Sequence, residues 1–235
     1  MYEHYKILKM KKLRFIALAL FVSAGVFAQK ENTKELEKFT ELKVYDRIVV
    51  SLVKSNENKL VITGDDKDEV SISNKNGLLK IKMEFGNFLD GDEAKATLYY
   101  TEELALIDSN ENAKIRSDET VKGDRVEIKT QEGGKIDLKI DIKDLYTKSV
   151  SGGEVTLTGS AAKQEVMVNT GGKTYNKQLD TKETTVVVNA GGRADINASD
   201  KVVAKVRAGG SIYIYGKPRS IEKDKVFGGK IKEMD

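Results

Sequence analysis

The residues best suited to bind a ligand lie in the last third of the chain, where tyrosines recur among polar side chains. Tyr175, Asp195 and Tyr213 each stand three positions after the second glycine of a Gly-Gly pair. Asn197 and Tyr215 each stand five positions after such a glycine. Aromatic planes beside hydrogen-bonding groups suit contacts with a sugar or a peptide. The alternative is that the tyrosines only cover the surface of a sheet, because aromatic residues favour β-strands.

The first 28 residues have the pattern of a secretory signal peptide. Basic residues between Lys11 and Arg14 precede an apolar stretch over residues 15–27, which is too short to cross a bilayer as a helix. Ala28 supplies the small residue before a cleavage site, and Met10 fits the true start of translation. The sequence therefore predicts export to the periplasm, the cell surface or the medium, with a short membrane anchor as the alternative.

The net charge of the exported part is close to zero. The chain contains 40 Lys and Arg against 37 Asp and Glu, for a net charge of +3. Subtracting the leader's five basic residues and one acidic residue leaves 35 against 36, a net charge of −1. We therefore expect no nucleic-acid partner, and no later apolar run is long enough for a membrane span.

Catalytic chemistry has few candidate residues in this chain. Cysteine is absent, and the only histidine, His4, lies in the predicted leader. The exported part therefore lacks the residues for a Ser-His-Asp triad, a cysteine nucleophile or a zinc site of histidine and cysteine. Residues 90–93 could bind calcium, but we favour an acidic surface loop, and we expect no metal and no cofactor. A glycosidase that uses two carboxylates is a less favoured alternative, since no pair of acids stands out.

Six Gly-Gly pairs divide the second half of the chain at nearly even steps. Their second glycines follow one another by 18 to 20 residues, which indicates a stacked repeat. We expect these glycines to form the corners of the repeat, because glycine accepts positive φ angles and lets neighbouring backbones approach closely. The second glycines are Gly134, Gly153, Gly172, Gly192, Gly210 and Gly229.

Each repeat has the pattern of two strands joined by a Gly-Gly corner and closed by a polar connection such as residues 180–183. Aliphatic residues such as Val155, Leu157 and Ile196 follow the corner by two or four positions and should point into a core, while the residues between them should face solvent. This length suits one coil of a parallel β-helix, in which coils stack about 4.8 Å apart. Hairpins that form a meander or a barrel are the alternative. A calcium-binding β-roll is excluded, because the Gly and Asp that it needs after each pair are missing.

The part before the repeats also has the pattern of short β-strands. Apolar residues recur over residues 60–62 and 79–83, and Asn76-Gly77 predicts a tight hairpin turn. The only helical candidate is Asn32–Phe39. Because no linker or low-complexity tract interrupts the chain, we expect residues 29–235 to form a single all-β domain.

Several of these segments resemble one family of exported proteins. The residues that carry the likeness are the corners at 150–159 and 188–196, the ending of 206–218 in Tyr-Gly-Lys-Pro, and the Asn-Gly-Leu-Leu-Lys-Ile hairpin at 76–81. They resemble the putative auto-transporter adhesin, head GIN domain family, over residues 39–218. The resemblance implies a right-handed parallel β-helix, secreted or periplasmic in a Gram-negative bacterium, in a family without an assigned biochemical role. The aspartate that the family usually carries after the second corner glycine is absent here.

The predicted function is therefore a non-enzymatic binding module of the cell envelope, similar to an adhesin, that contacts a glycan or an envelope protein. Its binding residues would be Tyr175, Asp195, Asn197, Tyr213 and Tyr215. The alternative is a structural envelope domain that assembles with copies of itself through open solenoid ends, since an unpaired strand edge accepts further strands.

Overall fold

The structure, a computed structural model, describes residues 31–84 and 94–235. The predicted signal peptide of residues 1–28 and the acidic segment of residues 90–93 lie outside the described residues. Among those that are described, no helix is long and apolar enough to cross a membrane. They form a β-solenoid of about seven turns with coils of about 19 residues, which confirms the fold class predicted from the Gly-Gly period. The right-handed sense of the coil stays a prediction.

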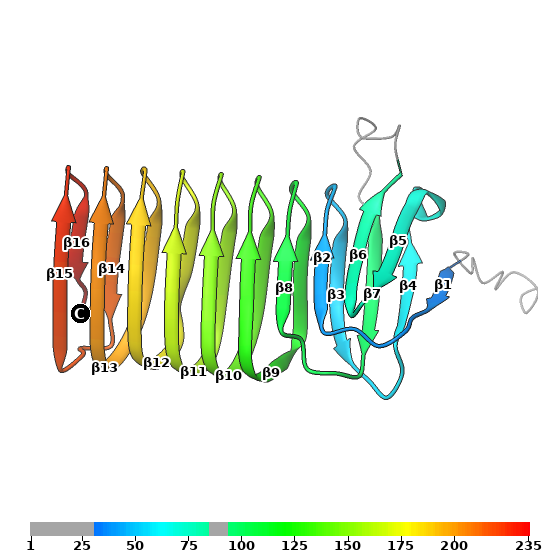
Figure 1. Cartoon of the computed structure of the whole chain (residues 1–235), viewed down its shortest axis with the longest axis horizontal. Helices are drawn as coiled ribbons and strands as arrows, with labels where there is room; N and C mark the ends of the chain where they lie inside the picture. The colour runs from blue at the N-terminus through cyan, green and yellow to red at the C-terminus, as the bar shows by residue number, and fades with distance from the viewer. Residues whose placement is uncertain (1–30, 85–93) are drawn as a thin grey trace, which may run out of the picture. The chain divides into compact units, whose positions relative to one another are not determined.

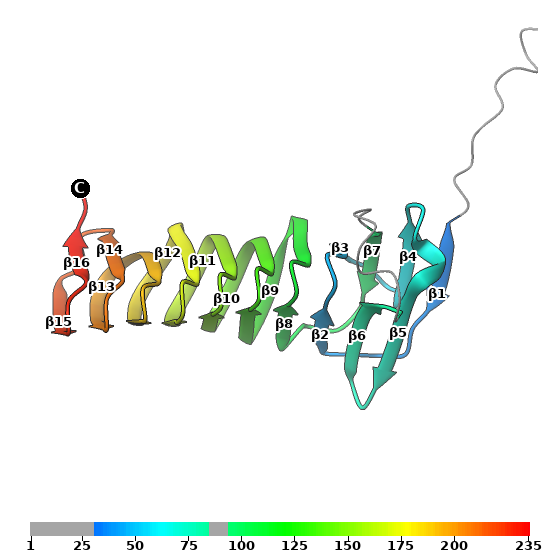
Figure 2. The same cartoon turned by 90° about the horizontal axis from the view of Figure 1, so that it is seen from above.

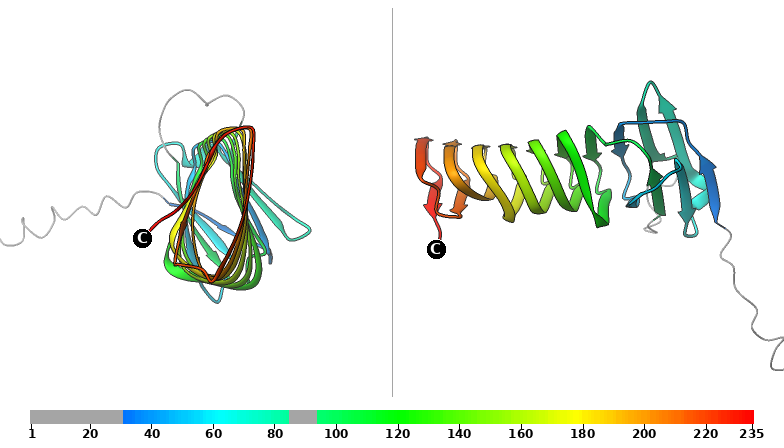
Figure 3. Two further views of the ribbon diagram at one scale, coloured as in Figure 1. Left: turned by 90° about the vertical axis from the view of Figure 1, so that its left-hand side faces the viewer. Right: turned by 90° about the horizontal axis from the view of Figure 1, so that it is seen from below.

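Five long strands build the regular part of the solenoid, and each makes almost a whole coil (Figure 1). They are β9 (Lys114–Thr130), β10 (Lys135–Ser149), β11 (Glu154–Val168), β12 (Lys173–Asn189) and β13 (Arg193–Arg207). Neighbouring strands pair in parallel one coil apart, so that Lys135 lies opposite Glu154 and Ser149 lies opposite Val168. Viewed end-on, each coil is a flattened loop (Figure 3). We call the half of a long strand that follows a Gly-Gly turn the first side, and the half that precedes the next turn the second side.

Shorter strands close the N-terminal end of both sides (Figure 2). They are β1 (Asn32–Glu35), β2 (Glu41–Val44), β3 (Val49–Lys54), β4 (Lys59–Thr63), β5 (Val70–Lys75), β6 (Leu78–Met83), β7 (Lys95–Tyr100) and β8 (Leu106–Ser109), with a short 3₁₀ helix, η1 (Lys67–Glu69), before β5. On the first side β3 and β7 continue the parallel pairing, and β4 and β1 follow antiparallel. On the second side β8, β2 and β6 are parallel, and β5 is antiparallel.

The segment from Asn32 to Phe39 contains a strand, so its prediction as a helix was wrong. β1 pairs with β4 along its whole length, and Asn32 lies opposite Ile62. Phe39 is 1 % exposed and belongs to the core. Sheet hydrogen bonds and the burial of Phe39 outweigh a local helical preference, because an isolated helix of this length is marginal in water.

The Gly-Gly corners are tight turns in which two successive residues have positive φ angles. After β10, φ is 48° at Ser151 and 76° at Gly152, and the Gly153 N–H donates to the Val150 carbonyl over 2.9 Å. This is the geometry of a type I′ turn. The predicted hairpin turn at Asn76-Gly77 has the same pair of positive angles and is confirmed. The first glycine of each pair therefore supplies a backbone conformation that other residues adopt at a cost.

The second glycine of each pair is required for a different reason. A Cβ atom on Gly172 would lie 2.2 Å from the carbonyl oxygen of Ser149 in the preceding coil, whereas one on Gly171 would meet nothing within 4 Å. A Cβ atom would also lie within 2.6 Å of the preceding coil at the remaining predicted corners, Gly134, Gly153, Gly192, Gly210 and Gly229. Only the last two of these also have positive φ, of 102° and 90°. Close stacking of the coils therefore selects the second glycine.

Two further turns of the same kind precede the Gly-Gly pairs and contain no glycine. The φ angles are 58° and 61° at Asp46 and Arg47, and 50° and 60° at Glu111 and Asn112. The Arg47 N–H donates to the Glu111 carbonyl over 3.0 Å, which continues the stack of turns. The glycine pattern misses these coils because aspartate and asparagine also tolerate left-handed backbone.

The inward positions predicted from the corners form the core. Val155, Leu157, Ile196, Ile212 and Ile214 are each at most 1 % exposed. Asn176 takes the corresponding position in its own coil and is completely buried. Neither polar atom of its amide has a hydrogen-bond partner among the described residues, so this coil carries a polar group in an apolar column.

The last coil carries charged residues at positions that point inward in the earlier coils. This end consists of β14 (Ser211–Tyr215), β15 (Ser220–Val226) and β16 (Lys230–Glu233). Lys223 lies opposite the buried Ala204, and Glu233 lies opposite the buried Ile214. Lys223 and Glu233 form an ion pair with each other. Inward-pointing charges of this kind protect an exposed strand edge from further pairing.

Candidate functional site

The predicted binding residues lie on the outer surface of the first side, in the last coils. Tyr175 on β12, Asp195 on β13 and Tyr213 on β14 form one row, because strand pairing places them opposite one another. Asn197 and Tyr215 lie opposite each other in a second, shorter row. Parallel stacking therefore brings together residues from three successive coils.

Asp195 is the most buried of these side chains, and Arg193 holds it in place. Arg193 Nε donates to Asp195 Oδ1, and Arg193 Nη2 donates to Asp195 Oδ2, both over 2.9 Å. These hydrogen bonds raise the pKa of Arg193 and fix the guanidinium in one plane with the carboxylate. Asp195 is only 6 % exposed, so the expectation that it faces solvent was wrong. The larger side chains of Tyr175, Tyr213 and Arg193 surround this short side chain and exclude water from it.

Arg193 also contacts the tyrosines on both neighbouring coils. Its guanidinium carbon lies 4.7 Å from the centre of the Tyr213 ring and 5.6 Å from the centre of the Tyr175 ring. Both distances fall within the range of about 6 Å for cation–π contacts. One arginine therefore connects three coils through two ring contacts, while its ion pair with Asp195 lies within its own strand.

Lysines lie over the remaining ring surfaces. Lys230 Nζ lies 5.4 Å from the centre of the Tyr213 ring, and Lys177 Nζ lies 4.8 Å from the centre of the Tyr215 ring. Lys232 on β16 lies opposite Tyr213 and extends the first row by one coil. We call this surface the tyrosine–cation face: Tyr175, Asp195, Asn197, Tyr213 and Tyr215 with Lys173, Lys177, Arg193, Lys230 and Lys232.

Sequence reasoning placed Lys177 and Lys232 on the outer surface but missed the other three cations of this face, although a signal for them was present. Lys173, Arg193 and Lys230 each stand one position after the second glycine of a pair. Counting outward positions from one residue after the corner would have placed them beside the tyrosines. Their contacts with the rings depend on side-chain packing between coils, which the spacing alone does not define.

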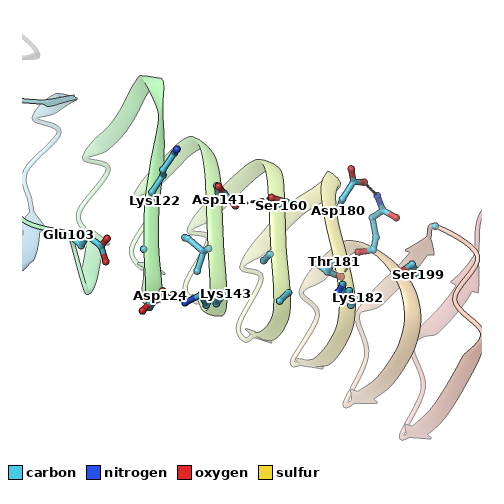
Figure 4. Close-up of a pocket in the computed structure, with 16 residues that line it drawn as sticks. Glu103, Lys122, Asp124, Asp141, Lys143, Ser160, Asp180, Thr181, Lys182 and Ser199 are labelled. Carbon is cyan, nitrogen blue, oxygen red and sulfur yellow. Dashed lines mark hydrogen bonds and ion pairs between the residues drawn. The ribbon is translucent and has the colours of Figure 1, made fainter.

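Asn197 lies at the edge of the face and is one of the residues that line a groove along the middle bend of the coils. Figure 4 shows this groove with Asp141, Ser160 and Asp180 labelled. The Asn197 amide nitrogen donates to Asp180 Oδ1 over 2.9 Å. The groove has a volume of about 880 Å³ and is lined by small residues from successive coils, among them Gly123, Ala161 and Gly216. Charged residues, small residues and Ile142 line it together, and none of the residues that line it is aromatic.

Two carboxylates of this groove, Asp141 and Asp180, are already engaged by neighbouring side chains. Asp141 and Asp180 lie on either side of Ser160 in one row, which separates them by two coils or about 10 Å. Inverting glycosidases place their carboxyl groups about 6.5–9.5 Å apart and retaining ones about 5–5.5 Å apart. Asp141 also accepts a hydrogen bond from Ser160 over 3.2 Å, and Asp180 accepts one from Asn197. Both acids are thus held by neighbours as hydrogen-bond acceptors.

A second group of carboxyls, which the sequence analysis did not single out, lies in the stack of turns near the N-terminal end. A hydrogen bond with Asp46 is the main cause that raises the pKa of Glu111 to about 7, and burial and the charges of Asp46 and Glu132 add to it. A pocket of about 500 Å³ adjoins this pair and is also lined by Tyr45 and Lys82. Carboxyls in direct hydrogen-bond contact are too close for glycoside hydrolysis. Among the described residues no group of three or more acids or histidines could hold a metal ion.

Comparison with known proteins places the chain in a family. Residues 38–218 match the family described as "Putative auto-transporter adhesin, head GIN domain". The chain belongs to this head GIN domain family. The resemblance stated from its corners, its hairpin and its Tyr-Gly-Lys-Pro ending is thereby confirmed. No match was found among curated proteins.

Solved structures show the same fold as this head GIN domain. A protein from Bacteroides fragilis described as a putative adhesin is 20 % identical, with a TM-score of 0.79 over 87 % of this chain and 96 % of that one. A protein from Parabacteroides distasonis described as a putative lipid binding protein is 15 % identical, with a TM-score of 0.66 over 88 % of this chain and 98 % of that one. A putative adhesin from Parabacteroides merdae is 14 % identical, with a TM-score of 0.62 and coverage of 88 % and 96 %. At these identities the likeness concerns the solenoid, and the tyrosine–cation face has to be argued from this chain.

Proposed function

We propose that this chain is a non-enzymatic binding module of the cell envelope and that the tyrosine–cation face contacts its ligand, a glycan or a protein. The observation that carries the proposal is the set of contacts that Arg193 makes with Asp195, Tyr175 and Tyr213, which order these side chains in one row. A site whose side chains are ordered before binding loses less entropy when the ligand arrives. The family name, the fold shared with proteins described as putative adhesins, and the predicted signal peptide support a location at the envelope or surface.

Binding rather than catalysis is favoured by the kind of groups that converge on the face. Tyrosines, cations and an amide offer hydrogen bonds and charge. The one carboxylate in the rows, Asp195, is already neutralised by Arg193. A flat surface along several stacked coils suits an extended ligand, as in other solenoid proteins.

The experiment is a glycan array and a pull-down from envelope extract with residues 29–235. Wild-type protein should bind, and the double variant Tyr213→Ala, Tyr215→Ala should lose most of the signal because two aromatic surfaces and the lysines that rest on them are disturbed. Tyr146→Ala is the matched control, since Tyr146 lies outward on the second side with Lys129 5.8 Å from its ring centre. No binding by wild type in either assay, or equal binding by the double variant, would refute the proposal.

Self-assembly through the solenoid ends is the alternative function. The charged residues of the C-terminal coil disfavour it. Strand addition at this end would bury the Lys223–Glu233 ion pair against a second chain. Burying charged groups in a new interface costs free energy that the added strand must overcome. We therefore propose the binding module as the function and treat assembly as a property to be measured.

A further inference from the structure

We infer that the ligand of the tyrosine–cation face is a linear polysaccharide that carries repeated acidic groups. The inference rests on the proposed function of this face and adds the chemical class of the ligand. It follows from three features of the face: an excess of cations, the covering of the tyrosine rings, and the alignment of the cations along the solenoid.

Positive charge is concentrated on this face although the exported chain is nearly neutral. Five cations, Lys173, Lys177, Arg193, Lys230 and Lys232, accompany one acid in the rows, Asp195. Two further acids adjoin this surface: Glu154 pairs with Lys173 over 3.0 Å, and Asp180 accepts a hydrogen bond from Asn197 over 2.9 Å. Lys177, Lys230 and Lys232 form no ion pair with the described residues, and the hydrogen bonds of Arg193 to Asp195 use Nε and Nη2 rather than Nη1. Such a surface attracts an anion and repels a cation.

Cations lie against the tyrosine rings of this face. Tyr213 has Arg193 and Lys230 against its ring, and Tyr215 has Lys177. A ligand that approaches the face therefore meets guanidinium and ammonium groups before it meets an aromatic plane. Contact with an acidic group on the ligand uses these cations as they stand, whereas stacking on a sugar ring would first have to displace them.

The cations follow the direction in which the coils stack. Lys173, Arg193 and Lys230 belong to the row one position after the corners, and successive coils in this row lie about 4.8 Å apart. A linear chain laid along the solenoid would meet a cation on nearly every coil. Repeated acidic groups on such a chain can contact several cations at once, which a small anion cannot do.

A membrane surface and a nucleic acid fit the face less well. A membrane-binding surface combines cations with several exposed apolar anchors, whereas a single large hydrophobic side chain, Phe227, is exposed among the described residues, in the turn that precedes Lys230. Proteins that bind single-stranded nucleic acid stack bases on aromatic rings, and each ring of this face already has a cation beside it.

The test measures binding of residues 29–235 to polygalacturonate, a linear polymer of acidic sugars, and to dextran as the neutral polymer. We expect binding to polygalacturonate and none to dextran, with affinity that falls as salt increases because exposed charges are screened. The double variant Lys230→Gln, Lys232→Gln should bind at least about tenfold more weakly. The control Lys148→Gln, Lys205→Gln removes two outward lysines from the second side and should bind like wild type. Unchanged thermal unfolding of all variants shows that they are folded.

The outcomes separate this inference from the proposed function. Equal binding of dextran, with loss in the Tyr213→Ala, Tyr215→Ala variant but not in the lysine variant, would overturn the acidic ligand and leave the binding face intact. Stronger binding to phosphatidylglycerol vesicles or to single-stranded DNA than to polygalacturonate would refute the inference that the ligand is a polysaccharide. Absence of any binding to glycans or envelope proteins would remove both proposals.

Discussion

Replacing each glycine of one Gly-Gly pair by alanine separates the two roles that the pair combines. Gly171 and Gly172 are neighbours in one turn, and the same methyl group is added in both variants. Gly171 has a φ of 72° and open space around its Cβ position. Gly172 does not have positive φ, but its Cβ position lies 2.2 Å from Ser149 O and 2.5 Å from Ser149 C.

The cost at Gly171 is conformational. Alanine in left-handed backbone costs about 1–2 kcal/mol relative to its preferred conformation. The loss of freedom in the unfolded chain returns about 0.4–1 kcal/mol, so the net destabilisation is about 1 kcal/mol.

The cost at Gly172 is steric and involves the backbone of another coil. The methyl group forces the coils apart at Ser149, whose carbonyl accepts the Asn169 N–H over 3.0 Å and whose Oγ accepts the Lys173 N–H over 3.1 Å. Weakening two hydrogen bonds costs about 1 kcal/mol each, and overpacking adds about 1–3 kcal/mol. We therefore expect Gly172→Ala to destabilise the domain by about 3–5 kcal/mol.

Thermal and urea unfolding of residues 29–235, followed by circular dichroism, measures the difference. For a domain of this size 1 kcal/mol shifts Tm by about 2–4 °C, so Tm should fall by about 10 °C in Gly172→Ala and by about 3 °C in Gly171→Ala. The fall in Tm of Gly153→Ala should lie between these two values, because the nearest backbone atom there, Thr130 C, is 2.8 Å away rather than 2.2 Å. A Gly171 variant as unstable as the Gly172 variant would refute the assignment of separate roles to the two glycines.

Three further predictions concern buried and charged positions. The folded pKa of Glu111 is raised to about 7 because its ionised form is disfavoured beside Asp46. The wild type should therefore lose stability as pH rises from about 4.5 through about 7. Glu111→Gln should not show this loss, because glutamine does not ionise. Since Glu111 is largely exposed, solvent screening limits this loss to about 1 kcal/mol in urea unfolding at pH 5 and pH 8. Asn176→Leu should stabilise the domain by about 1–3 kcal/mol in the same assay, because it removes an unpaired buried amide. Lys223→Ile, Glu233→Leu should increase association with concentration in light scattering, because it removes the charges from the open edge.

Each of these predictions has a clear contrary result. A wild-type free energy of unfolding that stays constant between pH 5 and pH 8 would contradict the raised pKa of Glu111. Destabilisation by Asn176→Leu would show that the amide has a partner that compensates its burial. An unchanged mass for the Lys223, Glu233 double variant would mean that other features of the last coil prevent strand addition.

The regular part of the fold could be predicted because its determinants are local in sequence. A tight turn needs residues that accept positive φ, and a two-sided coil needs apolar residues at alternate positions. Both requirements recur once a coil, so the spacing of Gly172 and Gly192 and the burial of Leu157 and Ile196 follow from counting. The first coils escaped this count because their turns use Asp46-Arg47 and Glu111-Asn112 in place of glycine.

The candidate site could be predicted only in part. The rows of Tyr175, Asp195 and Tyr213 follow from the period, because parallel strands one coil apart place equivalent residues side by side. The burial of Asp195 and the covering of the tyrosine rings by cations did not follow, since they depend on how long side chains pack across neighbouring coils.

The sequence by itself determined the solenoid, its coil length, its inward residues and its family, because backbone conformation and alternation are encoded residue by residue. Only the tertiary structure decided which groups meet between coils. β12 and β13 shift register between Tyr175 and Thr181, which no local pattern reveals. Arg193 contacts tyrosines of both neighbouring coils, and Glu111 meets Asp46 from a distant part of the chain, because contacts between coils depend on stacking geometry rather than on neighbours in sequence.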